Sequence, residues 1–150
     1  MNLELRKIDY SNQDLLNKIL DWRNDQETRT NSNNTNIITN EIFKLILQKY
    51  KESTIDPIII YLGNVEVGIF TFVKNDDKIF IGININPNYR NMKIGSKSLK
   101  LFIESSSKFS IKDIIYASIK KENTSSYNLF NKYFKFLNED QNYNHFYLDI

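Results

Sequence analysis

The segment Ile79–Ile103 joins a strand-like run to a helix-like run through a short basic loop. The apolar alternation of the first run stops before Pro87, and the second run has apolar residues at helical spacing. A helix that opens after such a loop presents unpartnered backbone N–H groups at its positive end, where phosphates bind. Gly95 permits close approach by a phosphate, and Arg90 adds a charge-assisted donor. We therefore expect a phosphate-binding loop over Arg90–Ser96.

Composition argues against several other kinds of site. The chain has no cysteine and a single histidine, His145, so disulfides, thiolate chemistry and a metal centre are not expected. Its 20 basic and 18 acidic residues give a net charge of +2, and the basic residues are scattered, which does not favour nucleic acid as a partner. No apolar run approaches the ~18–20 residues of a membrane span. We expect a cytoplasmic protein that binds neither nucleic acid nor membrane.

The spacing of apolar residues predicts the elements that would position this loop. The order of these elements predicts an α/β (α+β) fold with one domain over residues 1–150, in which about four helices flank a mixed sheet of six to seven strands. Besides the helix that follows the loop, helices are predicted over Asp14–Arg23, Glu41–Tyr50 and from Asn123 or Thr124 to about Tyr133. Strands are predicted over Leu3–Ile8, Ile55–Leu62, Val65–Val73, Ile79–Ile85, Ile111–Ile119, Phe134–Leu137 and His145–Leu148.

Residues Asn24–Asn40 form a polar stretch almost without apolar periodicity. The stretch is much longer than the ~4–6 residues of an ordinary connection. This length favours a lid or a binding loop.

Two sequence blocks resemble the GNAT acetyltransferase superfamily. Residues Arg90–Gly95 (RNMKIG) are similar to its phosphate-binding motif, Gln/Arg-x-x-Gly-x-Gly/Ala. Residues Asn123–Lys132 (NTSSYNLFNK) are similar to a second block, Asn-x-x-Ser-x-x-x-Tyr-x-Lys. The two blocks occur in the family's order, and the resemblance covers essentially the whole chain. It implies the GNAT fold, acetyl-CoA as the cofactor and acetyl transfer to an amine.

The resemblance also implies which residues hold the cofactor. The strand before the loop would align the pantetheine arm of acetyl-CoA. A backbone N–H around Asn84–Ile85, assigned here to Ile85, would stabilise the oxyanion of the tetrahedral intermediate. Lys93 occupies the family's first glycine position and is itself able to reach the phosphates. The implied cofactor-binding residues are Ile83, Asn84, Ile85, Arg90, Asn91, Met92, Lys93, Ile94, Gly95, Ser96, Asn123, Ser126, Phe130 and Lys132.

The proton-transfer residues of the family are less well matched. Phe80 and Asn86 stand where many relatives have carboxylates, which leaves Glu122, after the fifth strand, as the candidate base that acts directly or through water. Phe130 stands at the position of the family's acidic tyrosine. Tyr127 and Tyr133 lie about one turn away on the same predicted helix and are the candidate acids, although either residue is as well suited to packing.

The acceptor class is indicated by residues 20–29 (LDWRNDQETR), which resemble the opening block of a GNAT branch that acetylates nucleotide-linked amino sugars in nonulosonate pathways. In this interpretation Trp22 faces a sugar ring or base, Arg23 and Arg29 bind a nucleotide diphosphate, and Asn24 completes the substrate-binding set. The alternative roles are a core position for Trp22, an internal pair for Arg23 and a solvated Arg29. The first-choice partner is therefore a small-molecule amine, a nucleotide sugar.

Two other functions stay open. One keeps acetyl-CoA and changes the acceptor to a protein N-terminus or a small amine. The other is a catalytically silent module that binds acyl-CoA, which Phe80 and Phe130 favour. The aromatic C-terminal stretch NYNHFYLDI would allow a homodimer through the last hairpin, or packing beneath the acceptor.

Overall fold

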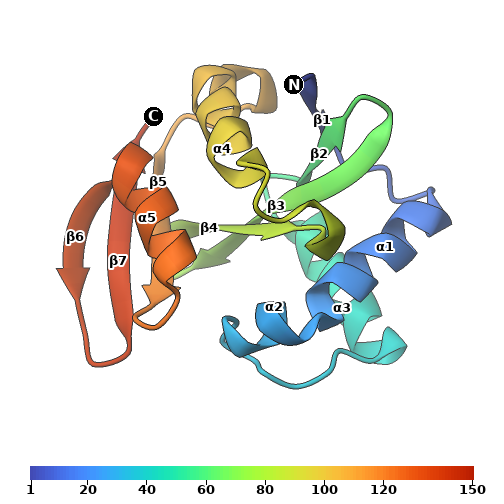
Figure 1. The fold of residues 1–150 in the computed structure, drawn as a ribbon, viewed down its shortest axis with the longest axis horizontal. Coiled ribbons are helices and arrows are strands. Elements are labelled where there is room, and N and C mark those ends of the chain that lie inside the picture. The colour runs from blue at the N-terminus through green and yellow to red at the C-terminus, as the bar shows by residue number, and fades with distance from the viewer.

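The computed structural model describes residues 1–150, which form seven strands and five α-helices (Figure 1). The strands are β1 (Leu3–Lys7), β2 (Ile58–Leu62), β3 (Val65–Asn75), β4 (Lys78–Ile85), β5 (Ile114–Lys120), β6 (Lys135–Glu139) and β7 (Tyr143–Asp149). The helices are α1 (Gln13–Asn24), α2 (Gln26–Thr30), α3 (Asn40–Glu52), α4 (Ile94–Glu104) and α5 (Thr124–Tyr133). Two short 3₁₀ turns cover Pro87–Tyr89 and Ser106–Phe109.

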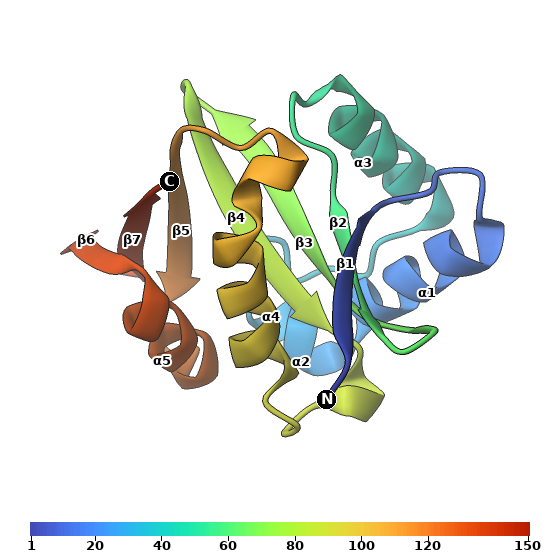
Figure 2. The same ribbon diagram turned by 90° about the horizontal axis from the view of Figure 1, so that it is seen from above.

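The strands form one sheet in the order β1-β2-β3-β4-β5-β7-β6. Every neighbouring pair is antiparallel except β4 and β5. These two strands pair only at Ile79 with Ile115 and at Phe80 with Tyr116, whereas β4 stays paired with β3 as far as Ile85. The sheet therefore opens between the far halves of β4 and β5, which diverge in Figure 2.

Helices cover both faces of the sheet (Figure 2). On one face, α4 and α5 pack over a core that contains Phe70, Phe102 and Phe146. On the other face, α1 and α3 enclose a smaller core that contains Trp22. The run Ile58–Ile60 in β2 is fully buried because successive side chains point alternately into these two cores.

Helix α4 begins differently from the other α-helices. A side chain caps the first turn of α1, α2, α3 and α5, from Asn12, Asp25, Thr39 and Asn123 respectively. The corresponding residue of α4 is Lys93, which has a left-handed backbone (φ 61°) and makes no side-chain cap. The first N–H groups of α4 therefore have no capping side chain.

The mixed sheet flanked by helices is confirmed, with five helices in place of about four. The additional helix is α2, a single short segment within the polar stretch Asn24–Asn40. Sequence periodicity missed α2 because none of its five residues is buried, so it has no apolar face. None of the helices has the length and apolar character that a membrane crossing requires.

Candidate active site

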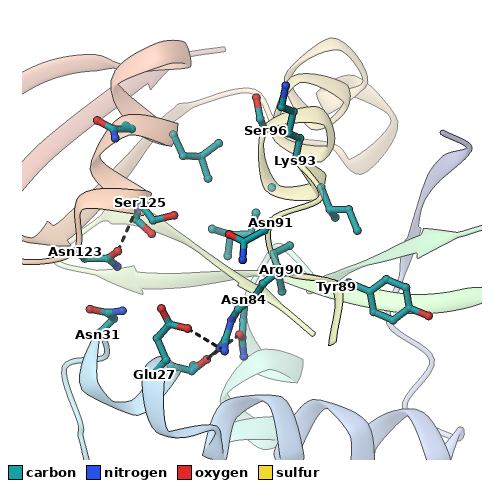
Figure 3. A pocket seen from close by; sticks show the side chains of 18 of the residues that line it. Glu27, Asn31, Asn84, Tyr89, Arg90, Asn91, Lys93, Ser96, Asn123 and Ser125 are labelled. Carbon is teal, nitrogen blue, oxygen red and sulfur yellow. Dashed lines mark hydrogen bonds and ion pairs between the residues drawn. The ribbon is translucent and has the colours of Figure 1, made fainter. Parts of the chain in front are cut away.

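A cleft of about 800 Å³ occupies the opening between β4 and β5 (Figure 3). We call it the main cleft. Its walls come from α2 and the following turn, the end of β4, the loop into α4, and the first turns of α5. Among its lining residues are Glu27, Thr28, Ile83, Asn84, Gly95 and Ser126.

The wall made by β4 carries backbone donors. Asn86 donates its N–H to the carbonyl of Val67 at 2.8 Å, directly after the last register pair of β3 and β4, Gly68 with Ile85. Because N–H groups alternate sides along a strand, those of Ile83 and Ile85 point away from β3, toward the opening. These N–H groups lie beyond the last residue of β4 that pairs with β5. They are therefore available to an extended ligand that lies along β4.

The loop into α4 forms a second wall. Asn91 (φ 63°) and Lys93 (φ 61°) both have left-handed backbones, which turn the chain tightly into the helix. At Gly95, an added Cβ would lie 3.6 Å from Leu129 and 3.9 Å from Ile83, so the position is roomy. The uncapped N–H groups of the first turn of α4 and the adjacent Lys93 together make a donor set that suits a phosphate.

Helix α5 adds polar groups beside the start of α4. Lys132 donates to the hydroxyl of Ser96 at 3.4 Å, and the hydroxyl groups of Ser96 and Tyr133 are 3.1 Å apart. The hydrogen bond with Ser96 lowers the pKa of Tyr133. Tyr133 therefore lies beside Ser96 of the predicted phosphate loop and does not itself line the main cleft. This position does not favour Tyr133 as the acid for a thiolate at the β4 opening.

Arg90 lines the main cleft, but its guanidinium is already paired. It pairs with Glu27 at 2.9 Å (Figure 3). It also contacts the carboxylate of Asp25 and donates to the hydroxyl of Thr28 at 3.2 Å. The guanidinium of Arg90 lowers the pKa of Asp25. The sequence predicted Arg90 as a phosphate donor, whereas the structure directs its side chain to the segment that holds α2.

All the predicted cofactor residues except Met92 and Phe130 line the main cleft. Met92 is exposed on the loop and does not reach the cleft wall. Phe130 is only 1% exposed and packs against Phe134 and Phe146, because it lies on the inward face of α5. Half of the lining residues that the sequence did not single out belong to α2 and its following turn, which reach the cleft through tertiary contacts, and the others are Tyr89 and three residues of α5.

The predicted proton-transfer residues lie outside the main cleft. Glu122 is exposed in the turn after β5 and does not line the cleft. Tyr127 packs its ring edge against Phe146, at a centroid distance of 5.5 Å. Both residues belong to the expected elements, after β5 and on α5, but neither lines the cleft. Asn123 does line the cleft, and its side chain also caps α5 by accepting from the N–H of Ser126 at 3.2 Å.

The four predicted acceptor residues have different environments. Trp22 is 4% exposed and packs in the core between α1 and the sheet, so its ring faces neither pocket. Asn24 both donates to and accepts from the backbone of Ile38. Arg29 donates to the carbonyls of Asn24 and Thr35. These contacts hold the loop after α2 in place, which leaves Arg23 as the predicted acceptor residue that lines a pocket.

A second pocket, which we call the side pocket, opens beside the end of β4 on the face covered by α1 and α3. Its volume is about 190 Å³. Its apolar wall includes Ile19, Phe43 and Ile69, and its polar groups come from Arg23, Thr28, Ser32, Tyr50, Thr71 and Asn84. The side pocket and the main cleft share Thr28, Ser32, Ile83 and Asn84 as lining residues. The two spaces therefore meet at the end of β4.

Two contacts hold the loop after α2 over the junction from the β5 side. Lys120 donates to the carbonyl of Thr30 at 3.1 Å, and the hydroxyl of Tyr143 donates to the side chain of Asn33. On the β4 side, Thr28 donates to the side chain of Asn84 at 3.3 Å. The segment thus connects the two halves of the sheet across the opening.

Comparison with known proteins identifies the class to which this fold and site belong. Residues 16–136 match the sequence family described as the acetyltransferase (GNAT) family, and the chain belongs to that family. It is an N-acetyltransferase of the GNAT type that uses acetyl-CoA. No curated protein sequence matches the chain significantly.

Solved structures show the same fold at low sequence identity. An N-acetyltransferase from Staphylococcus aureus Mu50 has a TM-score of 0.75 and 18% identity, with 99% of each chain covered. The N-acetyltransferase PseH of Campylobacter jejuni, in complex with acetyl coenzyme A, has a TM-score of 0.72 and 17% identity over 99% of each chain. RimL, a ribosomal L7/L12 alpha-N-protein acetyltransferase, has a TM-score of 0.78 and 16% identity over 100% of this chain and 95% of its own.

Proposed function

We propose that this protein transfers the acetyl group of acetyl-CoA directly to the primary amine of a small molecule that enters from the side pocket. The observation that carries this proposal is the junction at the end of β4. There, the N–H groups of Ile83 and Ile85 face the main cleft, and Asn84 and Thr28 line both spaces. A donor and an acceptor therefore meet at one short stretch of strand.

The donor set of the main cleft fits acetyl-CoA, whose thioester supplies the acetyl group. The N–H groups of Ile83 and Ile85 on the edge of β4 point the same way and suit the amide groups of the pantetheine arm. The uncapped start of α4 offers N–H groups to the phosphates. Lys93 and Lys132 add positive charge on the same side of the cleft. The N–H of Ile85 is the donor for the oxyanion that develops on the acetyl carbonyl.

No unpaired carboxylate lines either pocket. Glu27 is the single acidic residue of the main cleft, and it pairs with Arg90 at 2.9 Å, while the side pocket has no acidic residue. The acceptor amine therefore loses its proton to water. We expect the rate with a given amine to rise with pH until that amine is mostly neutral, without a plateau set by an enzyme carboxylate.

For the acceptor, the block at residues 20–29 supports a nucleotide-linked amino sugar as the first candidate. The likeness to RimL supports a protein N-terminus as the second candidate, at the level of the shared fold. The polar junction residues Thr28, Ser32 and Asn84 supply hydrogen-bond partners for the amine of either acceptor.

Release of free CoA thiol from acetyl-CoA, in the presence of a panel of amines, tests the proposal. The panel contains a nucleotide-linked amino sugar, short peptides with free N-termini, and small aliphatic amines. We expect amine-dependent thiol release and an N-acetylated product by mass spectrometry. Tight binding of CoA together with no release above the hydrolysis background for every amine would favour the silent acyl-CoA-binding module.

A further inference from the structure

The side pocket contains a cation that the acetyl transfer does not use. Arg23, in the last turn of α1, donates through Nη2 to the carbonyl of Asn34 at 3.0 Å. Its Nη1 is buried and has no hydrogen-bond partner. No carboxylate of the chain forms an ion pair with Arg23. The guanidinium of Arg23 therefore has one buried N–H donor, Nη1, without a hydrogen-bond partner, and its positive charge has no carboxylate partner.

The side chain of Arg23 is partly buried among apolar and neutral polar residues of the side pocket. Burial lowers the pKa of Arg23, and burial likewise raises the pKa of Tyr50, on the same pocket, to about 12. An unpaired charge in such a place is unfavourable, and an anion that enters is attracted more strongly than it would be in water. The pocket is thus complementary to a ligand that brings a negative charge.

The size of the side pocket limits what that ligand is. Its volume of about 190 Å³ corresponds to roughly six water molecules at ~30 Å³ each. Apolar residues, including Ile19, Phe43 and Ile46, form much of the wall. The space suits a short aliphatic group with a planar anion, and it is far smaller than a nucleoside diphosphate requires. A carboxylate matches the forked donors of a guanidinium.

The position of the pocket fixes the orientation of such a ligand. Arg23 belongs to the side pocket alone, whereas Thr28, Ser32 and Asn84 also line the main cleft. A molecule with its anion at Arg23 extends its other end to the junction, beside the free N–H groups of β4. That end is where the proposed transfer needs an amine.

We propose that the acceptor is a small amino-carboxylate, an aliphatic molecule with a carboxylate a few bonds from its primary amine, and that the guanidinium of Arg23 binds the carboxylate. This inference rests on the proposed function of the junction and replaces its first acceptor candidate with a smaller molecule that fits the side pocket. It favours amino-acid-like acceptors over nucleotide-linked sugars. The phosphates of such a sugar are also anionic, but the nucleotide is too large for the side pocket.

Matched pairs of acceptors test this inference. Thiol release with acetyl-CoA is measured for leucine against 3-methylbutylamine, for β-alanine against ethylamine, and for 4-aminobutanoate against propylamine, each at equal concentration of the neutral amine. A UDP-linked 4-amino sugar is included to test whether a phosphate-bearing acceptor is used in place of a carboxylate. In the wild type we expect kcat/KM for at least one carboxylate to exceed that of its partner by about 10- to 100-fold, the range of one charge-assisted hydrogen bond.

The variant Arg23→Met removes the charge and keeps an aliphatic chain. We expect it to raise KM for the preferred carboxylate by about 10- to 100-fold, with no rise for the matched amine and no change in CoA affinity. Arg23→Lys keeps the charge without the fork, so we expect an intermediate loss. Arg29→Met is the structural control, because Arg29 holds the same loop through backbone carbonyls and does not line the side pocket. Loosening of the loop alone would affect both members of a pair equally.

Binding of the same carboxylates to the CoA-loaded protein, measured by calorimetry, gives a readout that does not depend on turnover. Arg23-dependent binding supports the inference even if the amine chosen is a poor acceptor. Equal use of carboxylates and matched amines, with no Arg23-dependent binding, would overturn it and leave the proposed transfer standing. Arg23-dependent turnover of the UDP-linked sugar, in preference to every carboxylate, would also overturn it. Failure of all amines to release thiol would overturn the proposed function instead.

Discussion

Lys93 combines an unfavourable backbone conformation with a positive charge at the main cleft. It begins α4 with a left-handed backbone (φ 61°, ψ 21°), where the family pattern has a glycine. A side chain with a Cβ is unfavourable there by roughly 1–2 kcal/mol, and glycine adopts this conformation freely. The lysine also lines the main cleft, where its charge favours a phosphate.

We therefore expect Lys93→Gly to raise the free energy of unfolding by up to about 1 kcal/mol, since the relief of strain exceeds the extra freedom of glycine in the unfolded chain. The same variant weakens CoA binding because it removes a cation. Urea denaturation and calorimetry measure the two effects. Asn91→Gly is the matched control: Asn91 is also left-handed (φ 63°), but asparagine tolerates this conformation, so its gain is smaller. A loss of stability in Lys93→Gly would contradict the account.

Gly95 tests the phosphate end of the cleft. A Cβ added there would make ordinary contacts with Leu129 at 3.6 Å and Ile83 at 3.9 Å, so the fold accommodates a side chain. We expect Gly95→Glu to weaken CoA binding by more than about 10-fold, because it places a carboxylate among the phosphate donors. Gly95→Ala is the control for steric effects alone. Unchanged CoA affinity in Gly95→Glu would show that the phosphates bind elsewhere.

At the scale of elements, the position of β4 decides the geometry of the junction. Gly68 in β3 lies against it: an added Cβ would be 2.9 Å from the carbonyl oxygen of Asn84 and 2.9 Å from the side chain of Ile85. The carbonyl oxygen of Asn84 belongs to the backbone, so it cannot move away by a change of side-chain rotamer. The absence of a side chain at Gly68 therefore allows β3 and β4 to keep their register at the catalytic end.

We expect Gly68→Ala to destabilise the protein by about 1–3 kcal/mol through overpacking and to lower kcat more than it lowers CoA affinity. Thermal unfolding and thiol release are the measurements. Gly82→Ala is the comparison for stability, because its Cβ would meet only the rotatable hydroxyl of Thr71 at 2.8 Å. Equal loss of stability in the two variants would argue against a special constraint at the end of β4.

At the scale of the whole molecule, the last hairpin makes the free energy of unfolding fall as the solution becomes strongly acidic. The hydrogen bond from His145, with the N–H groups of Asn142 and Tyr143, lowers the pKa of Asp140 to about 2 from its ordinary value of 3.8. The folded protein then binds fewer protons than the unfolded chain between these values. The stabilisation is present above pH about 4 and is lost as the pH falls through about 2.

We expect Asp140→Asn to be less stable than the wild type at pH 6 and to lose less of its remaining stability between pH 4 and pH 2. Urea unfolding midpoints across this range measure the difference. Asp113→Asn is the control, because Asp113 is exposed and forms no ion pair. Parallel pH profiles for the wild type and Asp140→Asn would contradict the assigned cause.

The sequence predicts those parts of the molecule that depend on local pattern. The strand before Pro87, the turn into α4 and the open position of Gly95 follow from neighbouring residues, and the cleft forms around them. The pairing of Arg90 with Asp25 does not follow, because it joins residues 65 positions apart that meet only where α2 lies beside the end of β4. The buried place of Trp22 and the isolation of Arg23 are likewise consequences of tertiary packing.

We place acetyl-CoA along the open edge of β4, with acetyl transfer at the end of this strand. The most direct measurement is a titration of the isotope-labelled protein with CoA, followed through backbone amide resonances. We expect the largest shifts and the strongest protection from hydrogen exchange at Ile83, Ile85 and the first turn of α4, with little change at Ile79, where β4 pairs with β5. Shifts confined to other parts of the sheet, with Ile83 and Ile85 unaffected, would contradict the account.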